Sequence, residues 1–244
     1  MPEPPLDRDD FAKALYAKQD LYWREHPFHQ RLHRGELSPQ EIRAWVANRW
    51  YYQASLPRKD AAILANCLLP EVRRRWIGRI VYQDGAREGE GGLEAWLRLA
   101  EAVGLTREEV IAERHVASGV RFATDAYVTF ARERPWVEAV AASLTELFSP
   151  DLMRDRVAAM RRHYSWIDPA GHAYFESRTS AAAGDAEVGL DLVLTHCRTR
   201  AEQDAAQDAL AFKCDVLWAL LDSIEHAASD GSRDWTWETP SASR

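Results

Sequence analysis

The chain has 244 residues and a net charge of −7, with a pI of about 5.7, which argues against nucleic acid as its main partner. Hydrophobic residues make up 46% of it, and no Pro/Gly/Ser-rich linker divides it internally. We therefore expect one domain over residues 1–228. No stretch approaches the roughly 20 uncharged apolar residues of a membrane span. The N-terminal MPEPPLDRDD lacks a basic start followed by an apolar run, so it does not read as a secretory signal.

Helical signals follow one another along the chain. Ser38 is a candidate N-cap, followed by Pro39 and by Glu41 in capping-box spacing. The helix that begins there should end or kink at Pro57. The Gly-rich segment 85–92 lacks the Lys-Ser/Thr of a phosphate loop and a preceding strand, which indicates a flexible connection.

The second half continues the helical pattern. Gly104 should close a helix over about 92–103, and Thr106 with Glu109 forms a second capping box. Long helices are expected at about 185–200 and 202–227, and no apolar alternation predicts a strand. The sequence predicts an all-α single-domain helical bundle of about seven or eight helices, followed by a disordered tail at 229–244. New amphipathic runs also follow the prolines at 70, 135 and 150.

The three cysteines are Cys67, Cys197 and Cys214. They are an odd number and have neither metal-ligand nor redox-motif spacing. Each lies in an apolar helical context, so we expect reduced core residues in a cytoplasmic protein.

Several charged side chains fall on apolar helix faces. Arg49 shares a face with Ile42, Trp45, Val46 and Gln53, and Lys213 lies in the middle of a stripe of leucines. The same spacing places Arg79 with Val72, Trp76 and Gln83, and pairs Tyr174 with Arg178 at i, i+4. These cations should point into the bundle.

Two interpretations of the inward cations remain open. Each could pair with a buried carboxylate such as Asp60, Asp84, Glu146 or Asp215. Alternatively, several Arg and Lys residues enclosed with Tyr and Gln would suit a planar ligand that bears several carboxylates. Each buried pair must offset several kcal/mol of desolvation, so internal pairing becomes harder as the number of cations grows.

Three histidines, His26, His29 and His33, have spacing that could place them on one helix face and suggest a metal. Pro27 interrupts them, and the chain contains no ExxH motif. A surface or capping role is the favoured interpretation, and no metal ligand is predicted.

The longest informative segments are similar to those of the pyrroloquinoline-quinone synthase (PqqC) family. The resemblance extends from about residue 11 to residue 222. It rests on HPFH at 26–29, WVANRWYYQ at 45–53, KDAAILANC at 59–67, GGLEAWLRLAEAVGL at 91–105, GVRFATDAY at 119–127, SLTELFSP at 143–150 and FKCDVLW at 212–218.

This resemblance implies an all-helical fold like that of heme oxygenase, a homodimer, and one buried site in the bundle. It implies an oxidase that uses O2 as co-substrate, without metal or flavin, and that closes and oxidises a tricarboxylated quinone precursor with release of peroxide. The expected partner is a small aromatic polycarboxylate. Positions that match the family's binding pattern are Tyr22, Arg49, Tyr52, Gln53, Lys59, Arg79, Tyr127, Glu146, Arg156, Tyr174, Arg178 and Lys213.

Three further positions depart from the family pattern, and each has lost a histidine. They are Trp23, Gln83 and Met153. A fourth change, Val188, is expected to be peripheral. In the family, the histidine at position 83 is the expected base, and the one at position 153 lines the oxygen site with Tyr174 and Arg178. Glutamine cannot serve as a general base, and methionine can neither accept a proton at neutral pH nor form a strong hydrogen bond.

The sequence therefore leaves three hypotheses. The first is a divergent cofactor-independent oxidase acting on a carboxylated quinoline- or indole-quinone substrate. Its catalytic candidates are Tyr174, Arg178, Gln83, Glu146 and Tyr127, with Tyr174, Glu146 and Tyr127 as remaining bases. The second is a non-catalytic carrier or sensor of a pyrroloquinoline-type molecule. The third is a metal-dependent oxygenase on the same architecture, which the missing ExxH disfavours.

Overall fold

The computed structural model describes residues 3–229, without the side chains at 179–183 and 229. Over this range the chain forms α-helices and short 3-10 helices and no strand, as predicted. The α-helices are α1 (Arg8–Tyr16), α2 (Pro27–Arg34), α3 (Pro39–Asn66), α4 (Pro70–Trp76), α5 (Gly78–Asp84), α6 (Gly91–Ala102), α7 (Arg107–Ile111), α8 (Ser118–Glu133), α9 (Trp136–Ala142), α10 (Ser149–His163), α11 (Ala173–His196) and α12 (Arg200–Ser229). The 3-10 helices are η1 (Ala17–Leu21), η2 (Trp23–Glu25), η3 (Ser143–Phe148) and η4 (Pro169–His172).

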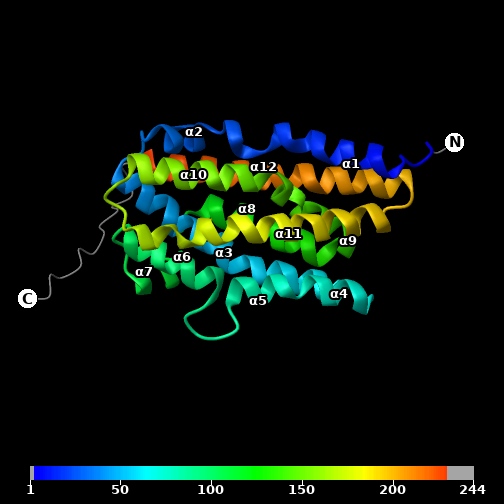
Figure 1. The fold of residues 1–244 in the computed structure, drawn as a ribbon, viewed down its shortest axis with the longest axis horizontal. Helices are drawn as coiled ribbons and strands as arrows, with labels where there is room; N and C mark the ends of the chain where they lie inside the picture. The colour runs from blue at the N-terminus through cyan, green and yellow to red at the C-terminus, as the bar shows by residue number, and fades with distance from the viewer. Residues whose placement is uncertain (1–2, 230–244) are drawn as a thin grey trace, which may run out of the picture.

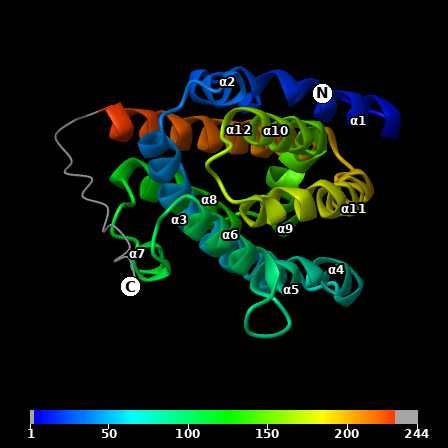
Figure 2. The same ribbon diagram turned by 60° about the vertical axis from the view of Figure 1, so that its left-hand side comes forward.

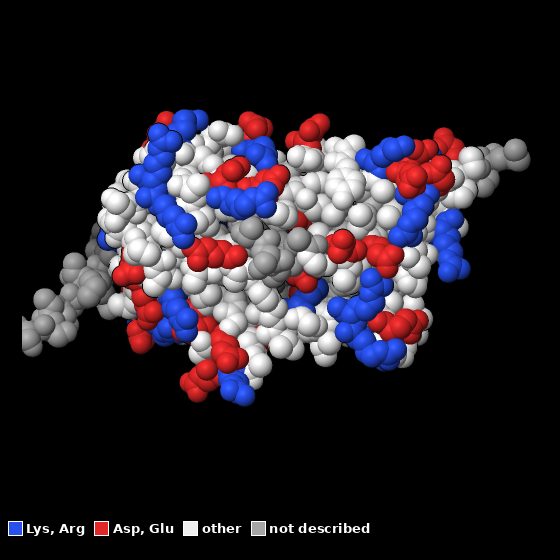
Figure 3. Space-filling model, viewed as in Figure 1, with Lys and Arg blue, Asp and Glu red and all other residues white. Residues whose placement is uncertain are grey.

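The long helices lie side by side in an elongated bundle (Figures 1 and 2). Helix α3 packs against α8, and α8 in turn packs against α12. Helices α10 and α11 pack on each other, and α9 contacts both α11 and α12. The short helices α4, α5 and α6 lie along one edge of the bundle (Figure 1). On the face seen in Figure 3, basic and acidic side chains are interspersed.

The predicted start and stop signals at several helix ends are confirmed. Ser38 Oγ accepts a hydrogen bond from the Glu41 amide, and the Glu41 side chain accepts one from the Ser38 amide. Thr106 and Glu109 form the second capping box at the start of α7. Gly104 follows α6 with φ +85°, a conformation that glycine adopts at little cost.

Some boundaries were wrongly predicted. The bundle has twelve α-helices in the described range, more than the seven or eight expected, because short breaks divide apolar runs that look continuous. One such break at Ile77 separates α4 from α5, so Trp76 and Arg79 lie on different helices. Helix α11 begins at Ala173, twelve residues before the expected Asp185.

Helix α3 continues through Pro57 to Asn66, so the proline does not end it, which was one of the two expected outcomes. Proline has no N–H to give to the carbonyl four residues earlier. That carbonyl belongs to Gln53, and it accepts a hydrogen bond from Gln83 Nε2 at 3.2 Å. A side chain from α5 therefore replaces the missing helical bond and helps α3 to accommodate the proline.

The core is rich in aromatic rings. Trp45 and Phe175 stack with centroids 6.0 Å apart, and Trp96 meets both rings edge to face. The three cysteines are buried and free, as predicted. No helix in the described range is long and apolar enough to span a bilayer. The predicted disordered tail at 229–244 lies outside the described residues, except that Ser229 ends α12.

Candidate active site

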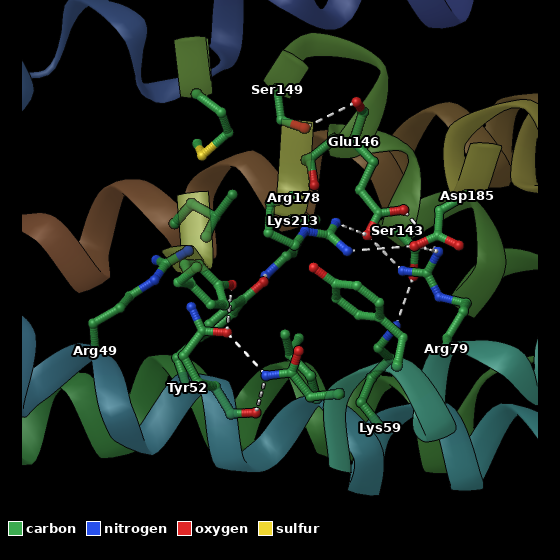
Figure 4. Close-up of a pocket in the computed structure, with 18 of the residues that line it drawn as sticks. Arg49, Tyr52, Lys59, Arg79, Ser143, Glu146, Ser149, Arg178, Asp185 and Lys213 are labelled. Atoms are coloured by element: carbon green, nitrogen blue, oxygen red, sulfur yellow. Dashed lines mark hydrogen bonds and ion pairs between the residues drawn. The ribbon is translucent and has the colours of Figure 1, made fainter. Parts of the chain in front are cut away.

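A polar pocket lies inside the bundle between α3, α5, α8, η3, α10, α11 and α12 (Figure 4). All the site residues predicted from the sequence line it, although they come from elements spread over the whole chain. They are Tyr22, Trp23, Arg49, Tyr52, Gln53, Lys59, Arg79, Gln83, Tyr127, Glu146, Met153, Arg156, Tyr174, Arg178 and Lys213. The structure brings these side chains together; their chemical roles remain predictions.

One half of the pocket contains cations that are neutralised by acids. Arg79 forms a two-pronged ion pair with Glu146, with N–O distances of 2.5 and 2.8 Å. Arg178 Nη2 donates to the same carboxylate at 3.1 Å. Lys59 Nζ lies 2.5 Å from Asp60 Oδ1. We call this the paired half: Lys59, Arg79 and Arg178 with Asp60, Glu146 and Asp185.

Within the paired half, Glu146 is strongly stabilised in its charged form, whereas burial raises the pKa of Asp185 and lowers that of Lys59. Burial alone would raise the pKa of Glu146, but Arg79 and Arg178 outweigh it and lower that pKa to about 2. Asp185 joins the network from α11, 3.3 Å from Arg79 and 3.4 Å from Arg178. The internal-pairing interpretation is therefore correct for these cations. Asp84 and Asp215, two of the acids suggested for it, form no ion pair in the described structure.

The other half of the pocket has three basic side chains and no acid. Arg49, Arg156 and Lys213 form no ion pair with any described carboxylate, and we call them the unpaired half. The Arg49 guanidinium lies 4.1 Å from the Tyr52 ring centroid, and its Nη1 is buried without a hydrogen-bond partner. Lys213 Nζ donates to Tyr52 Oη at 2.8 Å and lies 3.8 Å from the Tyr127 ring centroid.

Arg156 is the more enclosed of the two arginines in the unpaired half. It is 3% exposed and lies 4.5 Å from the Trp23 ring centroid. Its Nη2 contacts His29 Nδ1 at 3.1 Å, while its Nε has no partner. Burial, with the nearby charge of Arg49, lowers the pKa of Arg156 to about 9. Ring faces stabilise these cations only partly, so a bound anion would supply the missing negative charge.

A neutral hydrogen-bond network joins Gln53, Tyr174 and Gln83 within the pocket. Gln53 Oε1 accepts from Tyr174 Oη at 2.9 Å and from Gln83 Nε2 at 3.2 Å. Gly92 lies against the Gln83 amide, where an added Cβ would come within 2.6 Å of Oε1. The three positions at which the family resemblance predicts a lost histidine, Trp23, Gln83 and Met153, all face this pocket.

The sequence did not single out several polar residues of the pocket. Ser143 Oγ accepts from Lys59 at 3.0 Å and lies 3.1 Å from Tyr127 Oη. Asp185 lies seven residues after Arg178 on α11, a helical spacing that could have revealed it had the start of α11 been placed correctly. Other lining residues are Leu56, Asp60, Tyr82, Trp96, Thr145, Ser149, Phe175 and Leu217.

The histidines near the N-terminus have structural positions. His26 is the N-cap of α2 and its Nδ1 accepts from the Phe28 amide at 3.1 Å, which confirms the capping role. The surface role was wrong, because His26 and His29 are 0% and 3% exposed. Among the residues that the structure describes, no group of three or more His, Cys, Asp or Glu is arranged to hold a metal.

Comparison with known proteins agrees with this architecture. Among solved structures, a domain of unknown function with a heme oxygenase-like fold from Shewanella denitrificans aligns with a TM-score of 0.77 at 12% identity, over 93% of this chain and 97% of that one. A TenA homologue from P. horikoshii aligns with a TM-score of 0.70 at 14% identity, over 91% and 99%. These likenesses show that the fold is heme-oxygenase-like, as the resemblance implied.

Sequence comparison is more specific. A protein named pyrroloquinoline-quinone synthase from Pseudomonas aeruginosa is 52% identical over 93% of this chain and 91% of its own length. Another of that name, from Cronobacter sakazakii, is 50% identical over 91% of this chain and 88% of its own. The model of the TENA/THI-4/PQQC family matches residues 13–223. The chain therefore belongs to the TENA/THI-4/PQQC family, as a PqqC-type member.

Proposed function

We propose that this protein acts in the biosynthesis of pyrroloquinoline quinone, as an oxidase that uses O2 on a carboxylated quinone or quinoline-type substrate without metal or flavin. The observation that carries the proposal is the unpaired half, where Arg49, Arg156 and Lys213 share a buried, aromatic-walled space with no acid. The relatives named pyrroloquinoline-quinone synthase support the same reaction class.

The charge distribution favours a polyanionic ligand. Buried cations without acids are costly, since each loses hydration and regains only ring contacts and a few hydrogen bonds. Carboxylates of a bound substrate would complete the pairs, and guanidinium groups can bind them through two parallel hydrogen bonds. The rings of Trp23, Tyr52 and Tyr127 around these cations offer faces to a planar molecule.

In this proposal the residues near Tyr174 serve the oxygen chemistry. Tyr174 Oη donates to Gln53, so the hydroxyl is held in a fixed position. Arg178 would stabilise negative charge that develops on reduced oxygen. Glu146 and Asp185 already neutralise part of the positive charge of Arg178. How strongly Arg178 stabilises reduced oxygen therefore depends on how the bound substrate rearranges these ion pairs.

A non-catalytic binder is the second candidate, and the positions without histidine favour it. Gln83 and Met153 cannot take up a proton at neutral pH. The Trp23 ring lies near both Arg49 and Arg156, at 5.4 and 4.5 Å, and forms an apolar surface where an acid–base group would be expected. Such a protein would hold the ligand with the same cations without converting it.

The deciding experiment mixes purified, metal-stripped protein with the tricarboxylated quinone precursor of pyrroloquinoline quinone. Absorbance spectra and peroxide are measured with and without O2. We expect O2-dependent conversion with peroxide release. A shifted but static spectrum would favour the binder, and no spectral change would refute both candidates.

Two variants control this experiment. Arg49→Gln should weaken binding by about 10- to 100-fold, as expected for loss of a charged hydrogen-bond donor. Arg98→Gln removes an exposed guanidinium outside the pocket and should leave the reaction unchanged.

A further inference from the structure

Lys213 differs from the other lysine of the pocket in its surroundings. Its side chain is 1% exposed, like that of Lys59, but it has no acid, whereas Lys59 is paired with Asp60. Its Nζ lies between the Tyr52 and Tyr127 rings, 4.2 and 3.8 Å from their centroids. Figure 4 shows Lys213 between Arg49 on one side of the pocket and Arg79 on the other.

Burial and the neighbouring positive charges both disfavour the ammonium form of Lys213. Burial is the largest effect, and the positive charges of Arg49 and Lys59 on α3 act in the same direction, so its pKa lies well below the ordinary value for lysine. Cys214, its neighbour on α12, has a pKa raised by burial to about 11 and is an uncharged thiol at neutral pH. Glu146 from η3 opposes the shift, but its carboxylate is already bound by Arg79 and Arg178.

The other groups in the pocket are poor proton acceptors. Burial raises the pKa of Tyr22, Tyr52, Tyr127 and Tyr174, so their hydroxyls stay protonated at neutral pH. Asp60, Glu146 and Asp185 are each bound by cations. Burial raises the pKa of Asp185, but both Arg79 and Arg178 contact its carboxylate. The bases considered from the sequence, Tyr174, Glu146 and Tyr127, are therefore disfavoured.

We propose that the uncharged amine of Lys213 is the proton acceptor of the pocket, in place of the histidines that the family resemblance predicts and this chain lacks. The proposal rests on the proposed function. The amine takes a proton from a ring C–H bond of the carboxylated substrate, and the electron pair of that bond stays on the ring. The ring then passes two electrons to O2, which takes the proton from Lys213 and a second from a substrate N–H or O–H to give H2O2.

The ammonium formed in this step is stabilised where it stands. Tyr52 Oη can accept its hydrogen bond, and the Tyr127 ring face lies within cation–π distance. Carboxylates of the substrate, bound by Arg49 and Arg156, would supply negative charge that the surrounding side chains do not provide. A base whose proton affinity rises when substrate binds suits proton removal at neutral pH.

The first test measures Lys213 directly. The chain has four lysines, Lys13, Lys18, Lys59 and Lys213, so protein labelled with 13C at lysine Cε should give four signals. Each signal is followed by NMR between pH 6 and 11 and assigned by single Lys→Arg variants, or by elimination if one variant does not fold. We expect one signal, lost in Lys213→Arg, to titrate well below the exposed Lys13. Titration of Lys213 together with Lys13 would overturn the proposal.

The second test is kinetic and uses Lys213→Arg and Lys213→Met. Arginine keeps a positive charge but cannot accept the proton. If Lys213 is the base, both variants should lose at least about 100-fold in kcat, and Lys213→Arg should keep a KM within a few-fold of the wild type. If the residue only binds a carboxylate, Lys213→Arg should retain kcat. Wild-type kcat/KM should rise with pH through the Lys213 titration.

A third readout separates this proposal from the proposed function. The precursor is incubated with protein in D2O without O2, and deuterium entering its C–H positions is measured by mass spectrometry. Exchange that is lost in Lys213→Arg supports the base even if O2 oxidation is absent, in which case the oxidase assignment alone is wrong. Oxidation that persists in Lys213→Arg refutes the base and leaves the oxidase intact. Neither exchange nor oxidation by the wild type refutes both.

Discussion

Arg156 and Arg79 are buried guanidinium groups in the same pocket, but only Arg79 has carboxylate partners. The sequence placed Arg49, Arg79 and Lys213 inside the bundle, because each interrupts an apolar helical stripe. It could not show which cations are paired, because the acids come from distant elements: Glu146 from η3 and Asp185 from α11. Helical spacing fixes where a side chain points, whereas its partner depends on tertiary packing.

This difference predicts that replacing Arg79 lowers the stability of the fold much more than replacing Arg156. Arg79→Met would leave Glu146 with one of its two arginine partners and Asp60 without a weak contact, and should lower the free energy of unfolding by about 3 kcal/mol or more. Arg156→Met removes a buried charge that has no acid, so it should change the free energy by less than about 1 kcal/mol or increase it. Urea unfolding at pH 7 of both variants and the wild type measures this. Equal destabilisation by the two variants would contradict the division into a paired and an unpaired half.

At the scale of helices, the capping boxes and the glycine that follows a helix end were predicted correctly. Helix ends without a strong sequence signal were not predicted. Helix α4 ends at Trp76 and α5 begins at Gly78, so Ile77 separates them. No proline marks this break, and Gly78 is its only sequence signal. Pro57 does not end α3, although an end was one of the two expected outcomes; that expectation assumes that the carbonyl four residues earlier stays unsatisfied. Here Gln83 from α5 satisfies the Gln53 carbonyl, so contact between helices supports a helix that the local sequence disfavours.

This contact predicts energetic coupling between Pro57 and Gln83. Gln83→Leu should cost about 1–3 kcal/mol in the wild type, since it leaves the buried Gln53 carbonyl without a donor. In a Pro57→Ala background the alanine introduced there has a backbone N–H that can donate to the same carbonyl, so the cost of Gln83→Leu should fall by about 1 kcal/mol. A double-mutant cycle from urea unfolding measures the difference. Additive effects of the two substitutions would show that the side chain does not replace the helical bond.

At the scale of the whole molecule, the all-α architecture could be predicted because apolar spacing is helical throughout and no segment alternates like a strand. The heme-oxygenase-like arrangement came from the family resemblance, since spacing alone cannot order helices in a bundle. The positions of the histidines near the N-terminus could not be predicted from spacing. His29 was expected at the surface or in a cap, but it is buried. It contacts Arg156 on one side, and its ring lies 4.2 Å from the His33 ring, centroid to centroid.

The buried histidines predict how the stability of the whole fold depends on pH. Burial, with the charge of Arg156, lowers the pKa of His29 below its ordinary value, and likewise lowers that of His33 to about 4. Below about pH 6.5 the unfolded chain takes up protons that the folded protein excludes, so the free energy of unfolding should fall as pH decreases. His29 should contribute up to about 1.4 kcal/mol per pH unit once the pH is well below 6.5.

His29→Gln tests this contribution. The side-chain amide oxygen of glutamine can still accept a hydrogen bond from Arg156, but it does not titrate. Urea unfolding of the variant and the wild type is compared at intervals from pH 7.5 to pH 5. The variant should lose less stability than the wild type over this range, and the gap should open below pH 6.5. His163→Gln, at an exposed position, should follow the wild type. Parallel curves for His29→Gln and the wild type would mean that His29 accepts a proton in the folded state as readily as in the unfolded one. The charge of Arg156 would then not act on it as the contact between them implies.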